Sequence, residues 1–208
     1  MKKELHIAVL IMAAGASSRM NGIKQLMPWK DSNFLLETIK TVEQSNATAT
    51  HVILGSNAEI IISECNLNDK DIGIAINPNW TKGLGNSIAY GVNTVLKGKA
   101  EVDGILICLA DQPLLHYTYL NSLMEEFYQH PSKIIATNYG KKVGVPALFP
   151  KLLFDDLSNL EGDYGAKKLL NHKKHAIISF EVAHQNIDID TKEEYEELIN
   201  KTNSDTKA

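Results

Sequence analysis

Three basic residues follow the first apolar segment of the chain, in a stretch that lacks acidic residues. They are Arg19, Lys24 and Lys30, and neither Asp nor Glu occurs between Ser17 and Lys30. Small residues precede these cations, and they let a ligand approach the backbone so closely that successive N–H groups can bind phosphate oxygens. Because the chain as a whole is acidic, this stretch predicts a local binding site for an anion. Its two glycines do not have the spacing of a Walker A loop.

A second glycine-rich loop covers residues 77–87 and leads into a helix pattern. Gly83 and Gly85 begin a dinucleotide-binding pattern, but Ile88 stands where the third glycine of that pattern belongs. A glycine-rich entry to a helix can still hold an anion or the edge of a base on its N–H groups. This loop is therefore a further candidate for ligand binding.

A carboxylate stands at the end of an apolar strand pattern. Residues 104–109 are typical of a buried strand, and Asp111 follows at its carboxyl end, two residues before Pro113. A carboxylate at such a position can bind a divalent cation. The alternative is that Asp111 caps the next helix, but Pro113 intervenes and that helix begins nearer Tyr117. Cation binding is therefore the favoured interpretation.

Short apolar runs alternate with longer amphipathic segments along the chain. Strand patterns occupy residues 7–12, 51–54, 73–76, 104–109, 133–137 and 176–180, and helix patterns occupy residues 34–43, 86–96, 117–129, 165–172 and 192–200. Several strands are apolar on both faces, as in a parallel sheet that helices cover on both sides. The alternation predicts an α/β fold, a three-layer sandwich with a mostly parallel, Rossmann-like sheet. Ligands bind such a sheet beyond the carboxyl ends of its strands.

Length and composition limit the classes of protein to which the chain can belong. Its 208 residues suit one domain, expected over residues 1–200, followed by a disordered polar tail at residues 201–208. The net charge of −4 argues against a general affinity for nucleic acid or anionic membranes, and no apolar run approaches the ~20 residues of a membrane span. Two cysteines without a Cys-x-x-Cys pair fit the reducing cytosol, so we expect a cytoplasmic protein.

Six segments, in order, resemble the signature blocks of the MobA-like nucleotidyltransferases. They are LIMAAGASSRM at residues 10–20 with KQL at 24–26, NPNW and GLG within residues 77–87, DQP at 111–113, GVPALF at 144–149, GDYGA at 162–166 and DIDT at 188–191. The resemblance extends from about Ile7 to Leu198, nearly the whole chain. It implies the fold of the nucleotide-diphospho-sugar transferases. Within the family the sequence is most similar to the molybdenum cofactor cytidylyltransferases, which transfer CMP from CTP to the terminal phosphate of molybdopterin and release pyrophosphate.

The resemblance assigns roles to individual residues. It implies a Mg²⁺-dependent nucleotidyltransferase in which Arg19, Lys24 and Asp111 carry the catalysis, while Asp111 and Asp190 hold the metal ion. The residues expected to bind the nucleotide are Ala13, Ala14, Gly15, Ser17, Ser18, Arg19, Lys24, Gly83, Gly85 and Ser87. The expected substrates are CTP, or another nucleoside triphosphate, and a phosphorylated pterin-type acceptor. Docking to a molybdoenzyme is an expected partner interaction.

Two neighbouring acids, Asp188 and Asp190, are candidates for the second metal ligand. Asp188 and Asp190 alternate with isoleucines, so both lie on one face of a strand and the period does not choose between them. Thr191 and Glu194 have the spacing of a capping box, which predicts a helix that starts directly after Asp190. The resemblance also places the family's second metal ligand directly before this threonine. Both observations favour Asp190, with Asp188 in a supporting position.

Two positions, Ala14 and Val145, bear on which substrates are expected. Ala14 stands where guanylyltransferase relatives typically have a second glycine, and its methyl group crowds a purine more than a pyrimidine, so CTP is expected over GTP. Val145 replaces a histidine that is frequent in close relatives, so a sugar phosphate or alcohol phosphate is an alternative acceptor. A non-catalytic molybdenum-cofactor carrier or maturation factor is another alternative, against which the joint presence of the basic and acidic site residues argues.

Overall fold

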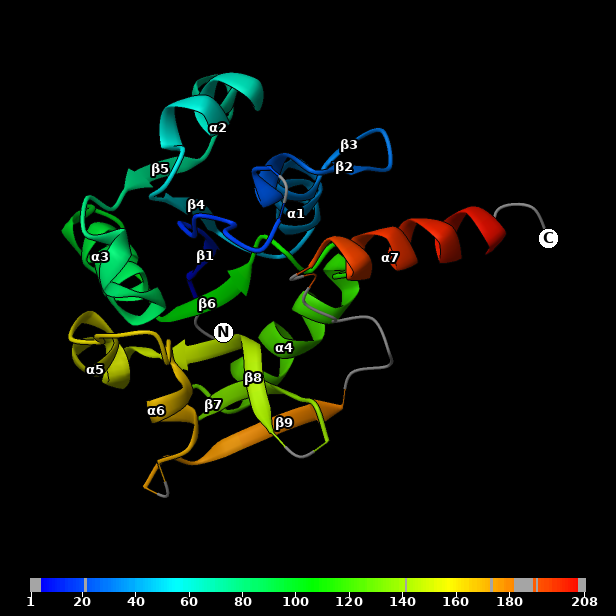
Figure 1. Ribbon diagram of the computed structural model, residues 1–208. Helices are drawn as coiled ribbons and strands as arrows, with labels where there is room; N and C mark the ends of the chain where they lie inside the picture. The colour runs from blue at the N-terminus through cyan, green and yellow to red at the C-terminus, as the bar shows by residue number, and fades with distance from the viewer. Residues whose placement is uncertain are drawn as a thin grey trace.

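The structure is a computed structural model that describes residues 5–20, 22–140, 142–172, 174–181, 189 and 191–205 (Figure 1). Within these residues the main sheet consists of β1 (Ile7–Ala13), β4 (Ala49–Leu54), β5 (Gly73–Ile76), β6 (Gly104–Leu109), β7 (Ile134–Asn138), β8 (Val143–Pro150) and β9 (Ile177–Glu181). The helices are α1 (Phe34–Glu43), α2 (Ala58–Glu64), α3 (Leu84–Lys97), α4 (Tyr117–Gln129), α5 (Phe154–Ser158), α6 (Lys167–Leu170) and α7 (Lys192–Asp205). Strands β2 (Pro28–Trp29) and β3 (Ser32–Asn33) form a separate small hairpin.

The sheet is mostly parallel, which confirms the predicted fold class. Its strands lie in the order β5-β4-β1-β6-β8-β7-β9, and β8 is antiparallel to its neighbours β6 and β7. The sequence does not predict β8, because Pro146 and Gly144 interrupt its apolar pattern. The sheet accommodates them at a register shift in the β7–β8 pairing, where the Thr137 hydroxyl donates a hydrogen bond to the Pro146 carbonyl oxygen at 2.8 Å.

Apart from the C-terminal helix, which is longer than expected, the predicted elements begin and end within two residues of the expected bounds. Helices α1 and α4 begin and end at the predicted residues, whereas the short helices α2 and α5 and the hairpin β2–β3 are additions. Helix α7 continues to Asp205, five residues beyond the predicted end at residue 200, so it includes the first residues of the segment for which a disordered tail is expected. Residues 206–208 lie outside the described part. None of the described helices combines the length and the apolar character needed to cross a membrane.

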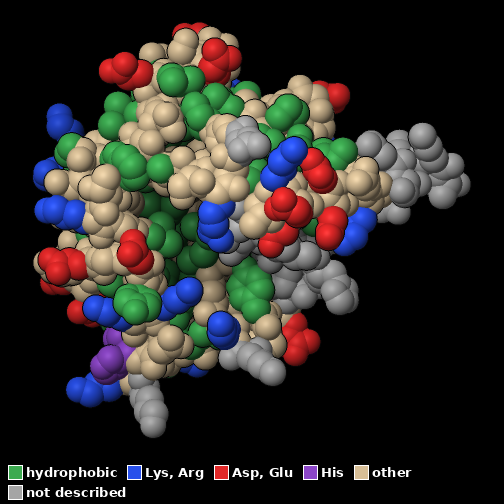
Figure 2. Space-filling model, viewed as in Figure 1, with side chains coloured by type: hydrophobic (Ala, Val, Ile, Leu, Met, Phe, Trp, Pro, Cys, Tyr) green, Lys and Arg blue, Asp and Glu red, His purple; other side chains and the backbone are tan. Residues whose placement is uncertain are grey.

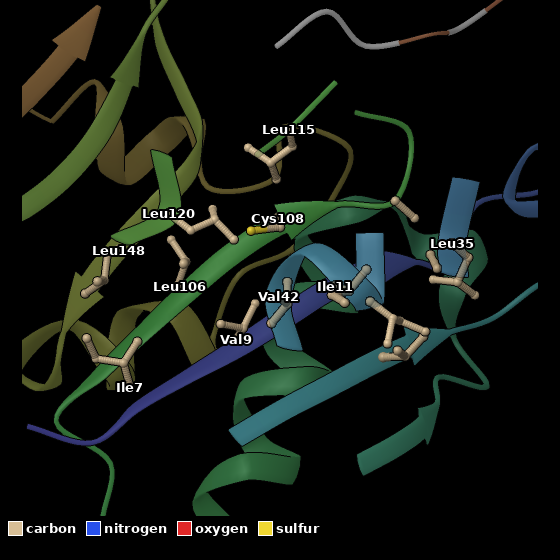
Figure 3. Packing of buried hydrophobic residues seen from close by; sticks show 14 of the residues in the cluster. Ile7, Val9, Ile11, Leu35, Val42, Leu106, Cys108, Leu115, Leu120 and Leu148 are labelled. Atoms are coloured by element: carbon tan, nitrogen blue, oxygen red, sulfur yellow. The ribbon is translucent and has the colours of Figure 1, made fainter. Parts of the chain in front are cut away.

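The two faces of the sheet carry separate hydrophobic cores. Every residue of β1 is buried, which explains its continuous apolar run. Ile7, Val9 and Ile11 point to the face covered by α1, α2 and α4, where they pack with Cys108 (Figure 3). The intervening β1 residues point to the opposite face, which α3 and α5 cover. Alternation across the sheet therefore produces the predicted three layers. Burial also raises the pKa of the Cys108 thiol, which makes it an inert core residue.

The topology determines where a ligand can bind. From β1 the chain continues to β4 and then β5 on one side of β1, and it later returns to β6 on the other side. The carboxyl ends of β1 and β6 are adjacent, with Met12 opposite Leu109 in the parallel register. The loops that follow these two strands diverge from this switch point and leave a crevice between them. They are the loops that contain Lys24 and Asp111.

Candidate active site

A pocket of about 620 Å³ opens at the carboxyl ends of β1 and β6. This volume lies within the range usual for small-molecule sites, about 300–1,000 Å³. Figure 2 shows the hollow left of centre, with hydrophobic side chains in its depth and basic side chains near its edge. The lining residues are Met12, Ala13, Ala14, Gly15, Ala16, Ser17, Ser18, Arg19, Lys24, Gln25, Trp80, Thr81, Gly83, Leu84, Ser87, Leu109, Ala110, Asp111 and Asp163. They include all of the proposed nucleotide-binding residues except Gly85.

Hydrogen bonds to Gln25 and Ser17 fix the loop after β1. Gln25 lies in the short 3₁₀ turn Lys24–Leu26, and its side-chain amide nitrogen donates to the carbonyl oxygens of Ala13 at 2.8 Å and Gly15 at 3.2 Å. Ser17 has a left-handed backbone with φ of 56°. Its hydroxyl donates to Gln25 Oε1 at 3.2 Å and accepts from the Lys24 N–H at 2.9 Å. The loop thus folds around the Gln25 side chain, which is hydrogen-bonded to three of the surrounding residues.

Lys24 and Asp111 form an ion pair across the mouth of the crevice. The distance between Lys24 Nζ and Asp111 Oδ2 is 2.9 Å, and the two side chains are only 13% and 21% exposed. Arg19 lines the same pocket. Lys30 lies elsewhere: its ammonium group is 3.4 Å from Glu37 Oε2, and it is absent from the lining residues. The predicted anion site therefore contains two of the three loop cations.

Three contacts hold the turn that carries Asp111. The indole N–H of buried Trp29 donates to the Pro113 carbonyl oxygen at 3.1 Å, so Trp29 packs against the turn and does not line the pocket. The side-chain amide of Gln112, which is 1% exposed, donates to the Tyr139 hydroxyl oxygen at 3.1 Å. The Ile189 N–H donates to the Asp111 carbonyl oxygen at 3.0 Å. These contacts tie the turn to the β2–β3 hairpin, to Tyr139 directly after β7 and to the segment before α7.

The carboxylate of Asp111 has an oxygen available for a cation. Asp111 Oδ1 is buried and has no hydrogen-bond partner among the described residues, whereas Oδ2 accepts from Lys24. A buried oxygen of this kind fits a divalent cation that prefers oxygen ligands. No group of three or more His, Cys, Asp or Glu residues is gathered for a metal within the described ranges. A metal here therefore needs ligands from the nucleotide, from water or from residues outside those ranges.

The predicted second ligand, Asp190, and its neighbour Asp188 lie outside the described residues. Ile189 is 3% exposed and packs with Trp29 and Phe34, while its N–H binds the Asp111 backbone. The predicted capping box is confirmed, because the Thr191 N–H donates to Glu194 Oε2 at 2.9 Å and the Glu194 N–H donates to the Thr191 hydroxyl oxygen at 3.2 Å. Ile189 is therefore held at the Asp111 turn, and Thr191 belongs to the capping box of α7.

The glycines of the second loop pack against another segment of the chain. The Gly85 N–H donates to the Gly162 carbonyl oxygen at 2.7 Å, so this N–H is occupied by protein and is not directed at a ligand. Gly83 has φ of 101°, and a Cβ atom there would collide with Gly162 and the Asp163 carboxylate. These glycines thus admit the segment that brings Asp163 into the pocket. Buried Asn77 supports the same loop by donating to the Ser87 hydroxyl oxygen at 3.1 Å.

Several lining residues escape prediction from the sequence. Trp80, Thr81, Leu84 and Asp163 come from loops whose proximity depends on the tertiary fold. Asp163 lies in the GDYGA block, which marks the segment but gives no reason for its position. Gln25 belongs to the KQL block, and its role as a support of the loop follows only from its hydrogen bonds.

A small-residue loop at the switch point of a parallel sheet is typical of nucleotide-binding α/β proteins, and the topology and pocket place this chain in that class. A family model sharpens the assignment. The model of the MobA-like NTP transferase domain matches residues 9–177, and the chain belongs to this family of nucleotidyltransferases.

Individual relatives match nearly the full chain. The chain is 30% identical over 200 residues to purine catabolism protein PucB of Bacillus subtilis (strain 168), covering 90% of this chain and 93% of that protein. It is 25% identical over 201 residues to nicotine blue oxidoreductase of Paenarthrobacter nicotinovorans, covering 91% and 95%. The structure of Rv0371c from Mycobacterium tuberculosis H37Rv is similar with a TM-score of 0.80 at 24% identity, over 94% of this chain and 98% of that one. A further Rv0371C structure is a complex with manganese.

Proposed function

We propose that this protein transfers CMP from CTP to the terminal phosphate of a molybdopterin-type cofactor and releases pyrophosphate. The observation that carries this proposal is the juxtaposition of Lys24 and Asp111, 2.9 Å apart, beneath the small-residue loop at the switch point. It provides a cation for a triphosphate and a carboxylate for a divalent metal within one pocket. Family membership supports nucleotidyl transfer, and the resemblance to the cytidylyltransferases supports the choice of substrates.

In the proposed reaction the main task of the protein is to bring two anions, the triphosphate and the acceptor phosphate, together. A terminal phosphate has a second pKa of about 6, so it is largely ionised at neutral pH and can attack the α-phosphorus without a general base. Lys24 and Arg19 line the pocket where they can bind the triphosphate oxygens and stabilise the charge of the departing pyrophosphate. The loop holds the α-phosphorus in position for in-line attack. These residues therefore supply positioning and electrostatic stabilisation.

Asp111 is the metal ligand of the proposal, and Asp190 is its proposed partner. Bound Mg²⁺ would supply positive charge at the α-phosphate and would orient the triphosphate. The unpartnered Asp111 Oδ1 fits this role. Lys24 binds Oδ2 in the structure. With metal and nucleotide bound, Asp111 would hold the metal and Lys24 would bind the phosphate chain.

The proposed choice of base depends on Ala14. Ala14 is 7% exposed and lines the pocket, so its methyl group limits the room beside the loop. CTP is therefore the proposed donor, with GTP as the alternative. The proposed acceptor rests on the resemblance to the cytidylyltransferases. Because Val145 replaces a histidine that is frequent in close relatives, the test includes other phosphorylated acceptors.

The test is a pyrophosphate-release assay that combines each of the four nucleoside triphosphates with molybdopterin, a sugar phosphate or an alcohol phosphate, in the presence of Mg²⁺. We expect release with CTP and the pterin, and little release with other combinations. Lys24→Met should lose this activity, while Lys30→Met, which removes a loop cation outside the pocket, should keep it. Release with a sugar phosphate alone would overturn the proposed acceptor. Tight cofactor binding without any release would identify a carrier instead of an enzyme.

A further inference from the structure

A buried glutamine has all of its described hydrogen bonds at the end of β1 or in the loop after it. Gln25 is 6% exposed, and its side chain reaches back across the chain to Ala13, Gly15 and Ser17. Burying a polar side chain is unfavourable unless its donors and acceptor find partners. Here every partner lies at the end of β1 or in the loop that follows it, and all three line the proposed triphosphate site. Gln25 therefore supports that loop specifically, and its contacts determine the direction of the loop's peptide groups.

The geometry of the peptide bond shows what this support does. In a trans peptide the C=O of one residue and the N–H of the next point in opposite directions. Gln25 Nε2 binds the carbonyl oxygens of Ala13 and Gly15, at 2.8 and 3.2 Å. The N–H groups of Ala14 and Ala16 consequently point away from Gln25. Both alanines line the pocket, and among the described residues neither N–H has an acceptor. These two N–H groups are available to phosphate oxygens.

Ser17 links the same support to the lysine. Its hydroxyl donates to Gln25 Oε1 and accepts from the Lys24 N–H, at 3.2 and 2.9 Å. The left-handed backbone of Ser17, with φ of 56°, turns the chain so that this hydroxyl faces inward. The Met20 N–H closes the turn by donating to the Ser17 carbonyl oxygen at 2.9 Å. One buried amide thus connects the loop N–H groups with the backbone that carries Lys24.

We infer that Gln25 is a positioning residue for triphosphate binding, which aims the N–H groups of Ala14 and Ala16 and, through Ser17, holds Lys24 in place. This inference rests on the proposed function, because it assumes that the ligand of the loop is a nucleoside triphosphate. Gln25 need not touch the ligand itself. Its effect is on the affinity for the phosphate chain and not on recognition of the base.

The test measures binding of inorganic tripolyphosphate and of CTP by calorimetry in the Gln25→Met variant, whose side chain has similar length but cannot make the three hydrogen bonds. We expect affinity for both ligands to fall about tenfold or more, as loss of a net 1.4 kcal/mol would give. In Ser17→Gly, where glycine tolerates the left-handed backbone but lacks the hydroxyl, the affinity for both ligands should fall less than in Gln25→Met. Gln44→Met, at an exposed glutamine after α1, is the matched control and should bind as the wild type does.

The readouts separate positioning from a general structural role. Thermal unfolding of each variant reports stability, and hydrogen exchange of the Ala14 and Ala16 N–H groups reports their protection by tripolyphosphate. In the wild type we expect protection of both groups, and in Gln25→Met we expect its loss. The inference would be overturned if folded Gln25→Met and Ser17→Gly both bound tripolyphosphate as tightly as the wild type does. It would also be overturned if tripolyphosphate did not protect the Ala14 and Ala16 N–H groups of the wild type from exchange. If the wild type binds CTP but transfers nothing, the proposed function fails while the positioning role stands.

Discussion

Replacing Lys24 with methionine tests the central ion pair of the pocket. Lys24 Nζ is the described partner of Asp111 Oδ2, at 2.9 Å, and Asp111 Oδ1 is buried without one. In the Lys24→Met variant neither carboxylate oxygen keeps a hydrogen-bond donor among the described residues. The stability of this variant therefore measures the free-energy penalty of a partly buried carboxylate that has lost its counterion.

The magnitude follows from this loss. Removing one partner of a buried hydrogen-bonded group costs about 1–3 kcal/mol, and both side chains are less than a quarter exposed, at 13% and 21%. We expect the free energy of unfolding of Lys24→Met to fall by about 1–3 kcal/mol. The double variant Lys24→Met/Asp111→Asn no longer contains the isolated charge, so it should be more stable than the single variant. The coupling between the two sites should exceed about 0.5 kcal/mol.

The same residues predict opposite effects on nucleotide binding. Lys24→Met should weaken CTP binding about tenfold to a hundredfold, since a hydrogen bond to a charged group contributes about 1.5–3 kcal/mol. In the absence of divalent metal, Asp111→Asn should bind CTP more tightly than the wild type, because it releases Lys24 and removes a negative charge from the pocket. Lys30→Met is the control and should leave CTP affinity unchanged.

Urea denaturation measures the first effect and calorimetry, with and without Mg²⁺, measures the second. We expect non-additive unfolding free energies and a tighter metal-free CTP complex in Asp111→Asn. Additive free energies, together with unchanged CTP affinity in Lys24→Met, would show that the two residues do not form a functional ion pair.

Three further predictions concern the metal, the base and the pH. Asp190→Asn should lower Mg²⁺-dependent pyrophosphate release more than Asp188→Asn, measured over a Mg²⁺ titration; a larger loss at position 188 would reverse the assignment. Ala14→Gly should raise the ratio of GTP to CTP turnover, compared as kcat/KM, and an unchanged ratio would remove the methyl group as the cause of selectivity. Burial lowers the pKa of His51 below its usual 6.5, so the unfolded chain takes up a proton that the folded protein resists. Stability should consequently fall as the pH drops through about 6.5, and His51→Gln should lessen this fall in urea titrations at several pH values.

Local pattern accounts for the part of the fold that could be predicted. The sequence identifies β1 and α1 directly. Strand β1 is buried on both faces and is therefore continuously apolar, whereas α1 is buried on one face and therefore has apolar residues at the helical period. Strand β8 lacks such a signal, since Pro146 and a register shift interrupt it. The end of α7 is equally hard to predict, because a polar composition does not distinguish an exposed helix from a disordered segment, and α7 continues to Asp205.

The candidate site shows the same division. Lys24 and Asp111 are identifiable from residue type and from their places after apolar strands, but their contact joins positions 87 residues apart in the sequence. That contact depends on the neighbouring positions of β1 and β6 in the sheet. Gly85 shows what sequence alone does not reveal: the glycine-rich loop suggests a ligand, whereas in the structure the Gly85 N–H donates to the Gly162 carbonyl oxygen. Glycine marks a close approach of backbone without revealing what approaches.

The central claim is that the α-phosphate of CTP moves to a phosphorylated acceptor in the pocket that Lys24 and Asp111 share. The most direct measurement follows CTP labelled at the α-phosphorus during incubation of the wild-type protein with Mg²⁺ and molybdopterin. We expect the label to appear in a cytidylylated pterin while an equal amount of pyrophosphate is released, and we expect Lys24→Met and Asp111→Asn to abolish both products. Label that remains in CTP, or that appears as free CMP independently of the acceptor, would exclude cytidylyl transfer to the pterin.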